Sequence, residues 1–285
     1  MILYLYKVKK GLVDMKEKWM ARIKEHYDHS LRYVLNENQV FGVFLVGSQN
    51  YGLATSDSDV DTRVIILPSV NEIATNAKPV SKQVIFEDEH LTLTDFRLWF
   101  KQLRKGDPSI VETLFTDYFI INPLYAEVWE DIVEAREDIS RFDEKATCHA
   151  IKGVFFNKKK YCFKKTEEKK EVFEKFGYNP KCLMTMLRLY NLLVRFTVQE
   201  ESLSTALKLD EHRNYLLDVK NGHHSLDEAK VLAEHYEERL TFLVNALDET
   251  IEKYSEVEKY YDTWHRMDKI AEKAFKLKLR GEVND

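Results

Sequence analysis

Apolar residues recur every three or four positions over residues 15–37, and this spacing predicts an amphipathic helix. Two short runs rich in β-branched and aromatic residues follow, VFGVFLV at 40–46 and VDTRVIILP at 60–68. Both have the length and composition of strands. A third run, KQVIFEDEHLTLT at 82–94, mixes apolar and polar positions and is predicted as one further strand. Helical patterns come after it, and one of them opens with Pro108, a residue that fits the first turn of a helix.

Strand patterns nearly vanish after about residue 124, and the rest of the chain carries helical periodicity, including a long segment that follows Ser225. The predicted fold class is therefore α+β. A small mixed β-sheet core with flanking helices is expected over residues 15–122, and an all-helical domain is expected over residues 123–285. Residues 1–14 are interpreted as an N-terminal extension of little structural weight.

The composition is that of an ordinary globular protein of 285 residues, 44% of them hydrophobic. The 43 basic and 48 acidic residues give a formal net charge of -5. This balance argues against a surface built for long nucleic acids, although it leaves room for a local basic patch. No apolar run approaches the ~20 residues that span a bilayer, so no membrane contact is expected. The three scattered cysteines do not form a disulfide framework or a cysteine zinc site, and they favour a reducing, cytoplasmic location.

The first two predicted strands enclose an unusual polar loop, within FLVGSQNYGLATSDSDVDTRVIIL at 44–67. Asp59 and Asp61 stand two residues apart at the start of the second strand, where their side chains would share a face and repel each other. Such a pair is stable chiefly when a cation bridges it, and hard divalent ions prefer carboxylate and phosphate oxygens. Gly47 permits close approach of the backbone, and Ser48 offers a hydroxyl and an amide to a phosphate. An isolated Asp-x-Asp is usually a solvated turn, but after a strand, Gly and Ser it indicates a phosphate-and-metal site.

The string GSQNYGLATSDSDVDTR resembles the DNA polymerase β-type nucleotidyltransferase superfamily, in which Gly-Ser is followed by Asp-x-Asp. Within that superfamily it is similar to the predicted nucleotidyltransferases of the RNA-ligase-associated (RlaP-like) type. These show Gly-Ser-x-x-Tyr/Trp-Gly, then Asp-Ser-Asp-x-Asp, then Arg. The similarity continues in TDFRLWFKQLRKGDPSIVETLF, FGYNPKCLMTMLRLYNLL and YLLDVKNGHHSLDEA. It extends from about residue 40 to residue 245 and is most specific at 47–63.

The resemblance implies an enzyme that transfers a nucleoside monophosphate from an NTP, with ATP as the expected nucleotide, to an acceptor hydroxyl. It implies that Gly47 and Ser48 hold the triphosphate and that Asp59 and Asp61 hold Mg²⁺ or Mn²⁺ in a two-metal mechanism. The association of the family with RNA ligases suggests an RNA end as the acceptor. The acidic net charge keeps a small molecule or a protein side-chain hydroxyl open as alternatives.

The superfamily usually has a third carboxylate on a neighbouring strand, which acts as general base on the acceptor hydroxyl. In this chain His90 stands where an aspartate is expected in relatives. Strand alternation would put Asp88 on the same face as His90, so Asp88 is expected to serve as the base and as a third metal ligand. His90 is itself the alternative base or ligand. The alternative is that residues 87–90 have no catalytic role and form a solvated edge strand.

Three basic residues are further candidates for nucleotide binding. Arg63 would point toward the site from the strand face of the two aspartates, or form an ion pair with one of the neighbouring aspartates. Lys181 and Arg188 lie on one face of an apolar helix, where basic side chains usually extend to water. The resemblance favours contact of both with the phosphates or the acceptor. Glu112 is expected to be a structural, buried partner for one of these bases.

A function of a different class stays open, namely a nucleotide-binding module with weak or no turnover, such as a regulator or one half of a toxin–antitoxin pair. The histidine at position 90 motivates it. No Gly-x-x-x-x-Gly-Lys loop occurs, so a P-loop NTPase is not supported. The run NKKKYCFKKTEEKK at 157–170 could contact single-stranded nucleic acid, but such a run is more often a solvated helix face.

Overall fold

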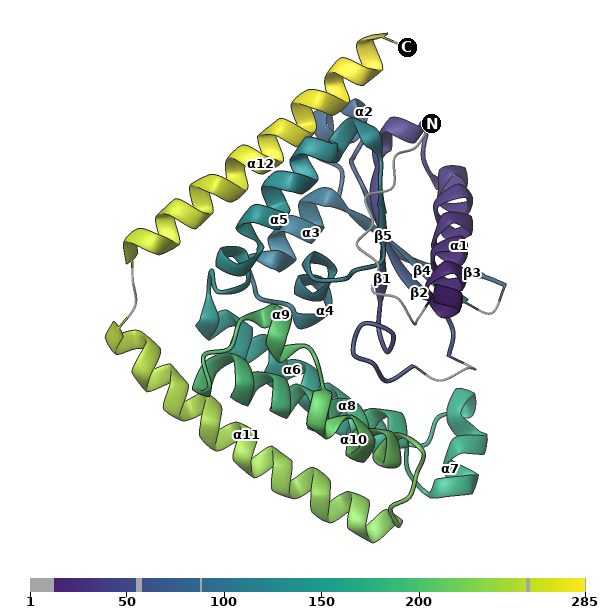
Figure 1. The fold of residues 1–285 in the computed structure, drawn as a ribbon, viewed down its shortest axis with the longest axis vertical. Coiled ribbons are helices and arrows are strands. Elements are labelled where there is room, and N and C mark those ends of the chain that lie inside the picture. The colour runs from purple at the N-terminus through teal and green to yellow at the C-terminus, as the bar shows by residue number, and fades with distance from the viewer. Residues whose placement is uncertain (1–12, 55–57, 88, 255–256, 285) are drawn as a thin grey trace.

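The computed structural model describes residues 13–54, 58–87, 89–254 and 257–284, and it has the predicted α+β architecture (Figure 1). Its core is a five-stranded mixed sheet with the strand order β3-β4-β2-β1-β5. The strands are β1 Val40–Val46, β2 Asp61–Ile66, β3 Ser81–Phe86, β4 Glu89–Asp95 and β5 Phe119–Ile121.

Helices surround the sheet and make up the second half of the chain. The longer ones are α1 Val13–Ser30, α3 Phe96–Leu103, α5 Ala126–Ser140, α6 Glu144–Cys162, α8 Pro180–Leu193, α10 Arg213–Lys220, α11 Leu226–Tyr254 and α12 Val257–Asn284. The shorter ones are α2 Val70–Ala74, α4 Pro108–Val111, α7 Lys170–Phe176 and α9 Leu203–Ala206. A π-helix, η6 Val194–Val198, continues α8. None of the described helices is long and apolar enough to cross a membrane.

The sheet brings the end of β1 beside the start of β2. These strands pair antiparallel, and Val46, the last residue of β1, lies opposite Asp61, the first residue of β2. On its other side β2 pairs with β4 in parallel, with Thr62 opposite Leu91. The register therefore places His90 next to Asp61 at the same edge of the sheet.

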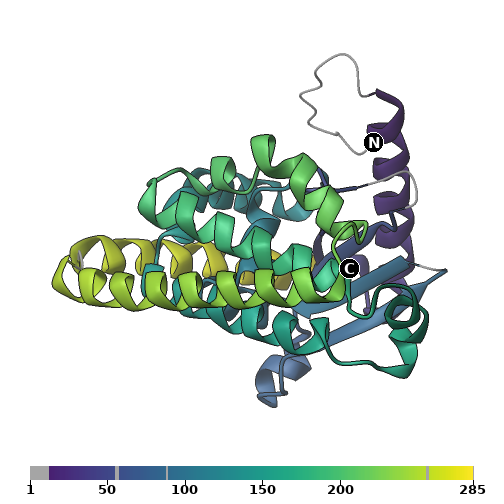
Figure 2. The same cartoon turned by 90° about the horizontal axis from the view of Figure 1, so that it is seen from below.

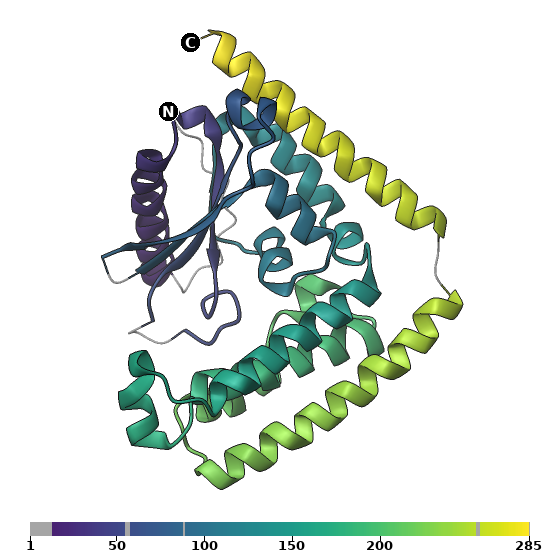
Figure 3. The ribbon, with the colours of Figure 1, turned by 180° about the vertical axis from the view of Figure 1, so that it is seen from behind.

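Helices cover both faces of the sheet, with α1 on one side and α3 and α5 on the other (Figure 3). Ile23 of α1 lies in one buried cluster with Val43 and Val64 of the sheet. On the opposite face Phe44 packs against Trp129 of α5, with ring centroids 5.1 Å apart. β1 is buried over nearly its whole length, so the polar groups beside it lie at its end, where the loop to β2 begins.

The helical half begins with α5 and folds back on itself. α6 and α8 pack together, and α11 runs along both (Figure 2). α12 then returns to α5, where Lys273 Nζ donates a hydrogen bond to Asp131 at 2.7 Å. Phe275 also reaches α3 of the first half and meets the ring of Phe96 at 5.8 Å. The division into domains at residue 122 stays a prediction, and α12 packs across it.

The single strand predicted over residues 82–94 is wrong, because this segment is a hairpin. β3 ends at Phe86 and β4 begins at Glu89, and the two strands pair antiparallel. Glu87 has a φ of +55°, a left-handed conformation that suits a tight turn. The alternation argument for Asp88 assumed one continuous strand, so it no longer holds. Asp88 itself lies outside the described residues.

The helix predicted over residues 15–37 is shorter than expected. α1 ends at Ser30, and two short 3-10 turns separate it from β1. At its start the helix includes Val13 and Asp14, which were assigned to the extension. The rest of that extension, residues 1–12, lies outside the described residues.

Candidate active site

The loop that follows β1 begins with a backbone conformation that favours glycine. Gly47 has a φ of +88°, a region that L side chains rarely enter. The Ser48 carbonyl accepts the N–H of Leu53 at 2.9 Å, which closes the loop on itself. The side chain of Asn50 donates to the carbonyl of Leu45 in β1 at 2.8 Å. These bonds fix the loop at the end of the strand.

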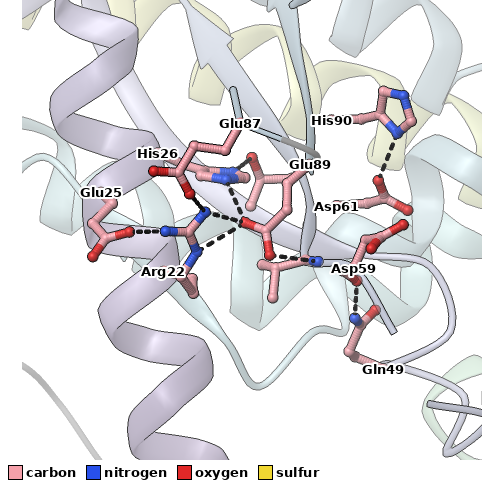
Figure 4. Close-up of polar contacts among 11 residues, drawn as sticks. Arg22, Glu25, His26, Gln49, Asp59, Asp61, Glu87, Glu89 and His90 are labelled. Carbon is pink, nitrogen blue, oxygen red and sulfur yellow. Dashed lines mark hydrogen bonds and ion pairs between the residues drawn. The ribbon is translucent and has the colours of Figure 1, made fainter. Parts of the chain in front are cut away.

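The two predicted carboxylates lie beside this loop. A Cβ built on Gly47 would stand 3.6 Å from Oδ2 of Asp61, so the absence of a side chain leaves the space between loop and carboxylate open. Asp59 is exposed, and its backbone carbonyl accepts a hydrogen bond from the Gln49 side chain of the loop. In Figure 4 the side chains of Asp59 and Asp61 point to the same side of the chain. The structure therefore brings the predicted loop and carboxylates together.

His90 lies next to these carboxylates at the start of β4. Its Nδ1 is 3.3 Å from Asp61 Oδ1, and the two side chains are 46% and 36% exposed. An imidazole thus faces the site at the position where a third carboxylate was expected. The predicted roles of His90 and Asp88 stay predictions.

Glu89 points the other way and ties the aspartate segment to α1 (Figure 4). Its Oε1 accepts the backbone N–H of Val60, which lies between the two aspartates, at 3.1 Å. Its Oε2 accepts from Nε and Nη2 of Arg22 at 2.9 and 2.8 Å, and it lies 3.0 Å from Nε2 of His26. Burial lowers the pKa of His26, although Glu89 opposes this. The sequence alone places Glu89 in a charged edge strand, because its partners lie far away along the chain.

Arg63 shares the sheet face of Asp61, as predicted, but its side chain turns toward β4. Its Nη1 donates to Thr94 Oγ1 at 3.0 Å, and within the described residues its buried Nε has no hydrogen-bond partner. Burial lowers the pKa of Arg63, and Asp107 opposes this. Among the described residues Arg63 forms no ion pair with Asp61, so it supplies positive charge near the carboxylates without neutralising them directly.

Two basic residues of α10 hold the loop from the helical half, and we call Arg213 and Lys220 the loop clamp. Arg213 Nε donates to the Gly52 carbonyl at 2.6 Å, and Lys220 Nζ donates to the Leu53 carbonyl at 2.8 Å. Burial lowers the pKa of Lys220, and the charge of the exposed Lys181 lowers it further. Lys181, predicted from the sequence, therefore lies close enough to Lys220 for its charge to act there. The loop clamp was not predicted, since its contacts join segments far apart in the chain.

Arg188 and Glu112 contact the loop at Tyr51 and at Gly47. The guanidinium of Arg188 lies 3.7 Å from the centroid of the Tyr51 ring. Glu112 is 5% exposed and accepts a hydrogen bond from the N–H of Gly47. Burial raises the pKa of Glu112 to about 8, and the charge of Arg188 opposes this. Among the described residues no ion pair joins Glu112 and Arg188, and Oε2 of Glu112 has no hydrogen-bond partner, so the partnership expected from the sequence stays a prediction.

The donors at this site suit a divalent cation. Two adjacent carboxylates on one face are the oxygen ligands that Mg²⁺ and Mn²⁺ prefer, and Mg²⁺ commonly takes its other ligands from phosphate and water. Within the described part of the chain, no group of three or more His, Cys, Asp or Glu side chains is placed to hold a metal. Asp59 and Asp61 are two ligands of this kind, and a cation held by them would take its other ligands from substrate and water.

Comparison with known proteins identifies a family whose sequence model matches the chain. A sequence model of the RNA repair pathway DNA polymerase beta family (RlaP) matches residues 15–272. Among solved structures, the chain is similar to a nucleotidyltransferase-like protein from Exiguobacterium sibiricum, with 11% identity, 90% of this chain and 89% of that chain covered, and a TM-score of 0.27. No curated protein matches. The family match covers both the sheet and most of the helical half.

Proposed function

The chain belongs to the RNA repair pathway DNA polymerase beta family and has a nucleotidyltransferase-type fold, and we propose that it transfers a nucleoside monophosphate from an NTP to an acceptor hydroxyl. The observation that carries this proposal is the meeting of Gly47 with Asp61 at the ends of β1 and β2, with Asp59 beside them. A loop suited to phosphate and a carboxylate pair suited to a cation lie within reach of one ligand.

The loop and the basic residues around it would receive the triphosphate. Because Glu112 takes the N–H of Gly47, the hydroxyl and amide of Ser48 are the donors left for a phosphate oxygen at this end of the loop. Gly47 itself contributes the open space. Lys181 and Lys220 add positive charge near the other end of the loop.

Two arginines would contribute to nucleotide binding in different ways. Arg63 lies on the face of Asp61 and adds positive potential close to the phosphates. Arg188 stacks on Tyr51 and acts on the nucleotide through the loop that it supports. Removal of either charge would weaken NTP binding, but only the loss of Arg188 would also loosen the loop.

Asp59 and Asp61 would hold Mg²⁺ or Mn²⁺, which when bound stabilises charge on the attacking and leaving oxygens of the phosphoryl group. The acceptor hydroxyl attacks the α-phosphate in line, and pyrophosphate leaves as the new phosphoester bond forms. Asp88 or His90 takes the proton of that hydroxyl. His90 has the supporting geometry, since its ring faces Asp61 at 3.3 Å.

ATP is the proposed nucleotide and an RNA end is the proposed acceptor. The RNA repair context of the family supports the second choice. A hydroxyl of a small molecule or of a protein would react in the same way, and the net charge of -5 keeps both as alternative acceptors to RNA. The three free, buried cysteines support a reducing, cytoplasmic setting.

Incubation with ATP labelled at the α-phosphate, Mg²⁺ and separate fractions of cellular RNA, metabolites and protein tests this function. We expect label to enter one fraction, with release of pyrophosphate, for the wild type and not for the double variant Asp59→Asn/Asp61→Asn. Asparagine keeps the size of the side chains, so an unchanged thermal melt shows that the fold persists. Equal labelling by the double variant would remove both aspartates from the mechanism.

One observation favours a second candidate, a nucleotide-binding module without turnover. His90 stands at the position where a third carboxylate is expected in relatives, beside Asp61. Thermal stabilisation by ATP without any release of pyrophosphate would support that candidate. Sustained release of pyrophosphate would rule it out.

A further inference from the structure

A pocket of about 460 Å³ lies among α8, η6, α10 and α11 in the helical half. Pockets of this size commonly hold small ligands in proteins. Its lining shares no residue with the candidate active site. Nevertheless Leu187 and His212 line it, and their sequence neighbours Arg188 and Arg213 contact the loop of the active site. The pocket and the loop thus lie on different faces of the same two helices.

Tyrosines from three helices converge on this pocket. Tyr190 and Tyr236 meet edge to face, with ring centroids 5.1 Å apart, and Tyr215 is 38% exposed. Burial raises the pKa of both Tyr215 and Tyr236, so their hydroxyls stay protonated and can donate hydrogen bonds. Aromatic faces with hydroxyl edges are surfaces on which nucleobases stack.

A buried amide oxygen and an exposed guanidinium of the pocket are available to a ligand. The Oδ1 atom of Asn191 is buried and, within the described residues, accepts no hydrogen bond, which is costly unless a ligand supplies a donor. The guanidinium of Arg239 lies 5.5 Å from the Tyr190 ring and has no carboxylate partner among the described residues. The other arginine of the pocket, Arg195, is paired with Glu201 at 2.7 Å. The pocket therefore offers a buried acceptor and an arginine that is outside any ion pair among the described residues, and Glu211 is a further carboxylate in its lining.

The backbone of the pocket wall departs from a regular helix. In η6 the N–H of Gln199 bonds to the carbonyl of Val194 at 3.1 Å, the wider spacing of a π-helix. Such turns are rare and often lie at functional sites. Arg195 lies in this turn and Gln199 follows it directly, and both line the pocket.

We propose that this pocket binds one nucleotide unit, a nucleobase with a single phosphate. A tyrosine would stack on the base, Asn191 would accept a hydrogen bond from an exocyclic amino group, and Arg239 would pair with the phosphate. One arginine outside any ion pair, in a pocket that Glu211 also lines, suits a single phosphate and not a triphosphate. The unit comes either from a single-stranded RNA or from a free nucleoside monophosphate. Its role as a subsite for the acceptor strand rests on the proposed function, but its binding does not.

Fluorescence anisotropy of a labelled single-stranded oligoribonucleotide, without NTP or metal, tests the proposal, with AMP as competitor. The variants are Asn191→Leu, which keeps the side-chain volume, and Arg239→Gln. Lys230→Gln removes a charge from the same helix outside the pocket and serves as the matched control. We expect each pocket variant to weaken binding about tenfold, the size of one charge-assisted or buried hydrogen bond, and the control to bind as the wild type does.

The two sources of the nucleotide give different results. Weakened oligonucleotide binding with no competition by AMP identifies an RNA strand, whereas competition by AMP shows that a free nucleotide is sufficient. The proposal is overturned if the wild type binds neither probe, or if all four proteins bind with equal affinity. Asp59→Asn/Asp61→Asn should bind both probes normally while losing transfer, so a failure of the proposed reaction is separable from a failure of the pocket.

Discussion

The carboxylate of Glu89 accepts the backbone N–H of Val60 at 3.1 Å, on the face of the sheet opposite the candidate site. The same carboxylate is held by Arg22 of α1. Val60 lies between Asp59 and Asp61, so a helix that does not border the candidate site constrains the segment that carries both predicted metal ligands.

We expect Glu89→Gln to lower the free energy of unfolding by about 1–3 kcal/mol, because it removes the least exposed of the carboxylates that pair with Arg22 and the charge beside the buried His26. Glu87→Gln is the matched control. Glu87 accepts from the same Arg22 at 2.9 Å, but its side chain is 64% exposed, so its removal should cost less than about 1 kcal/mol. Urea unfolding of both variants measures the difference. Equal losses would show that the charge of Glu89 contributes no more to stability than the charge of the exposed Glu87.

Glu112→Gln should flatten the dependence of stability on pH. The pKa of Glu112 rises from 4.5 to about 8 on burial, so over this range the folded state keeps a proton that the unfolded state releases. Wild-type stability therefore contains a contribution that is present below the lower pKa and is lost as pH rises through the upper one. Glutamine still accepts the Gly47 N–H but does not titrate. In urea unfolding between about pH 5 and pH 8, the variant should gain stability relative to the wild type as pH rises. A difference in unfolding free energy between variant and wild type that does not change with pH would contradict the raised pKa of Glu112.

Arg213→Met and Lys220→Met should release the loop from the helical half. We expect faster hydrogen exchange at the amides of residues 47–54 and about tenfold weaker NTP binding, since each variant removes a charged hydrogen bond to a loop carbonyl. Lys230→Met on α11, whose side chain pairs with Asp227 outside the loop, is the control. Unchanged exchange in the loop would mean that the loop clamp does not order it.

The general base can be identified by two substitutions. If Asp88 is the base, Asp88→Asn should abolish transfer while NTP binding persists through Asp59 and Asp61. If His90 is the base, His90→Ala should do so instead. Single-turnover transfer and equilibrium NTP binding, measured on both variants, separate the two cases. Full transfer by both variants would place the base elsewhere, for example on the acceptor.

Local signals in the sequence predicted the part of the site that the chain builds within a few residues. β1 has the predicted bounds, because a β-branched and aromatic run stops at Gly47, where the backbone turns left-handed. The register of β1 and β2 then places Asp61 beside that glycine. Loop and carboxylates could be predicted together because one turn joins them.

Features that depend on distant or very short segments could not be predicted in this way. β5 has three residues, too few to show a period, and the turn at Glu87 was hidden in a polar run that also fits an exposed strand. Arg213 and Lys220 carry no local pattern that distinguishes them from other surface cations. Their role emerges only when α10 lies against the loop.

The return of α12 to the first half sets the order in which this protein can mature on the ribosome. Phe96 is synthesised early but obtains its partner Phe275 only when the last helix emerges, and Arg104 likewise waits for Trp264, whose ring lies 4.1 Å from its guanidinium. Until then a nascent chain exposes an aromatic face on α3, which invites aggregation or chaperone binding. Translation must therefore be almost finished before α3 and α5 are covered on their outer side, and a ribosome stalled ahead of α12 holds a chain without this packing.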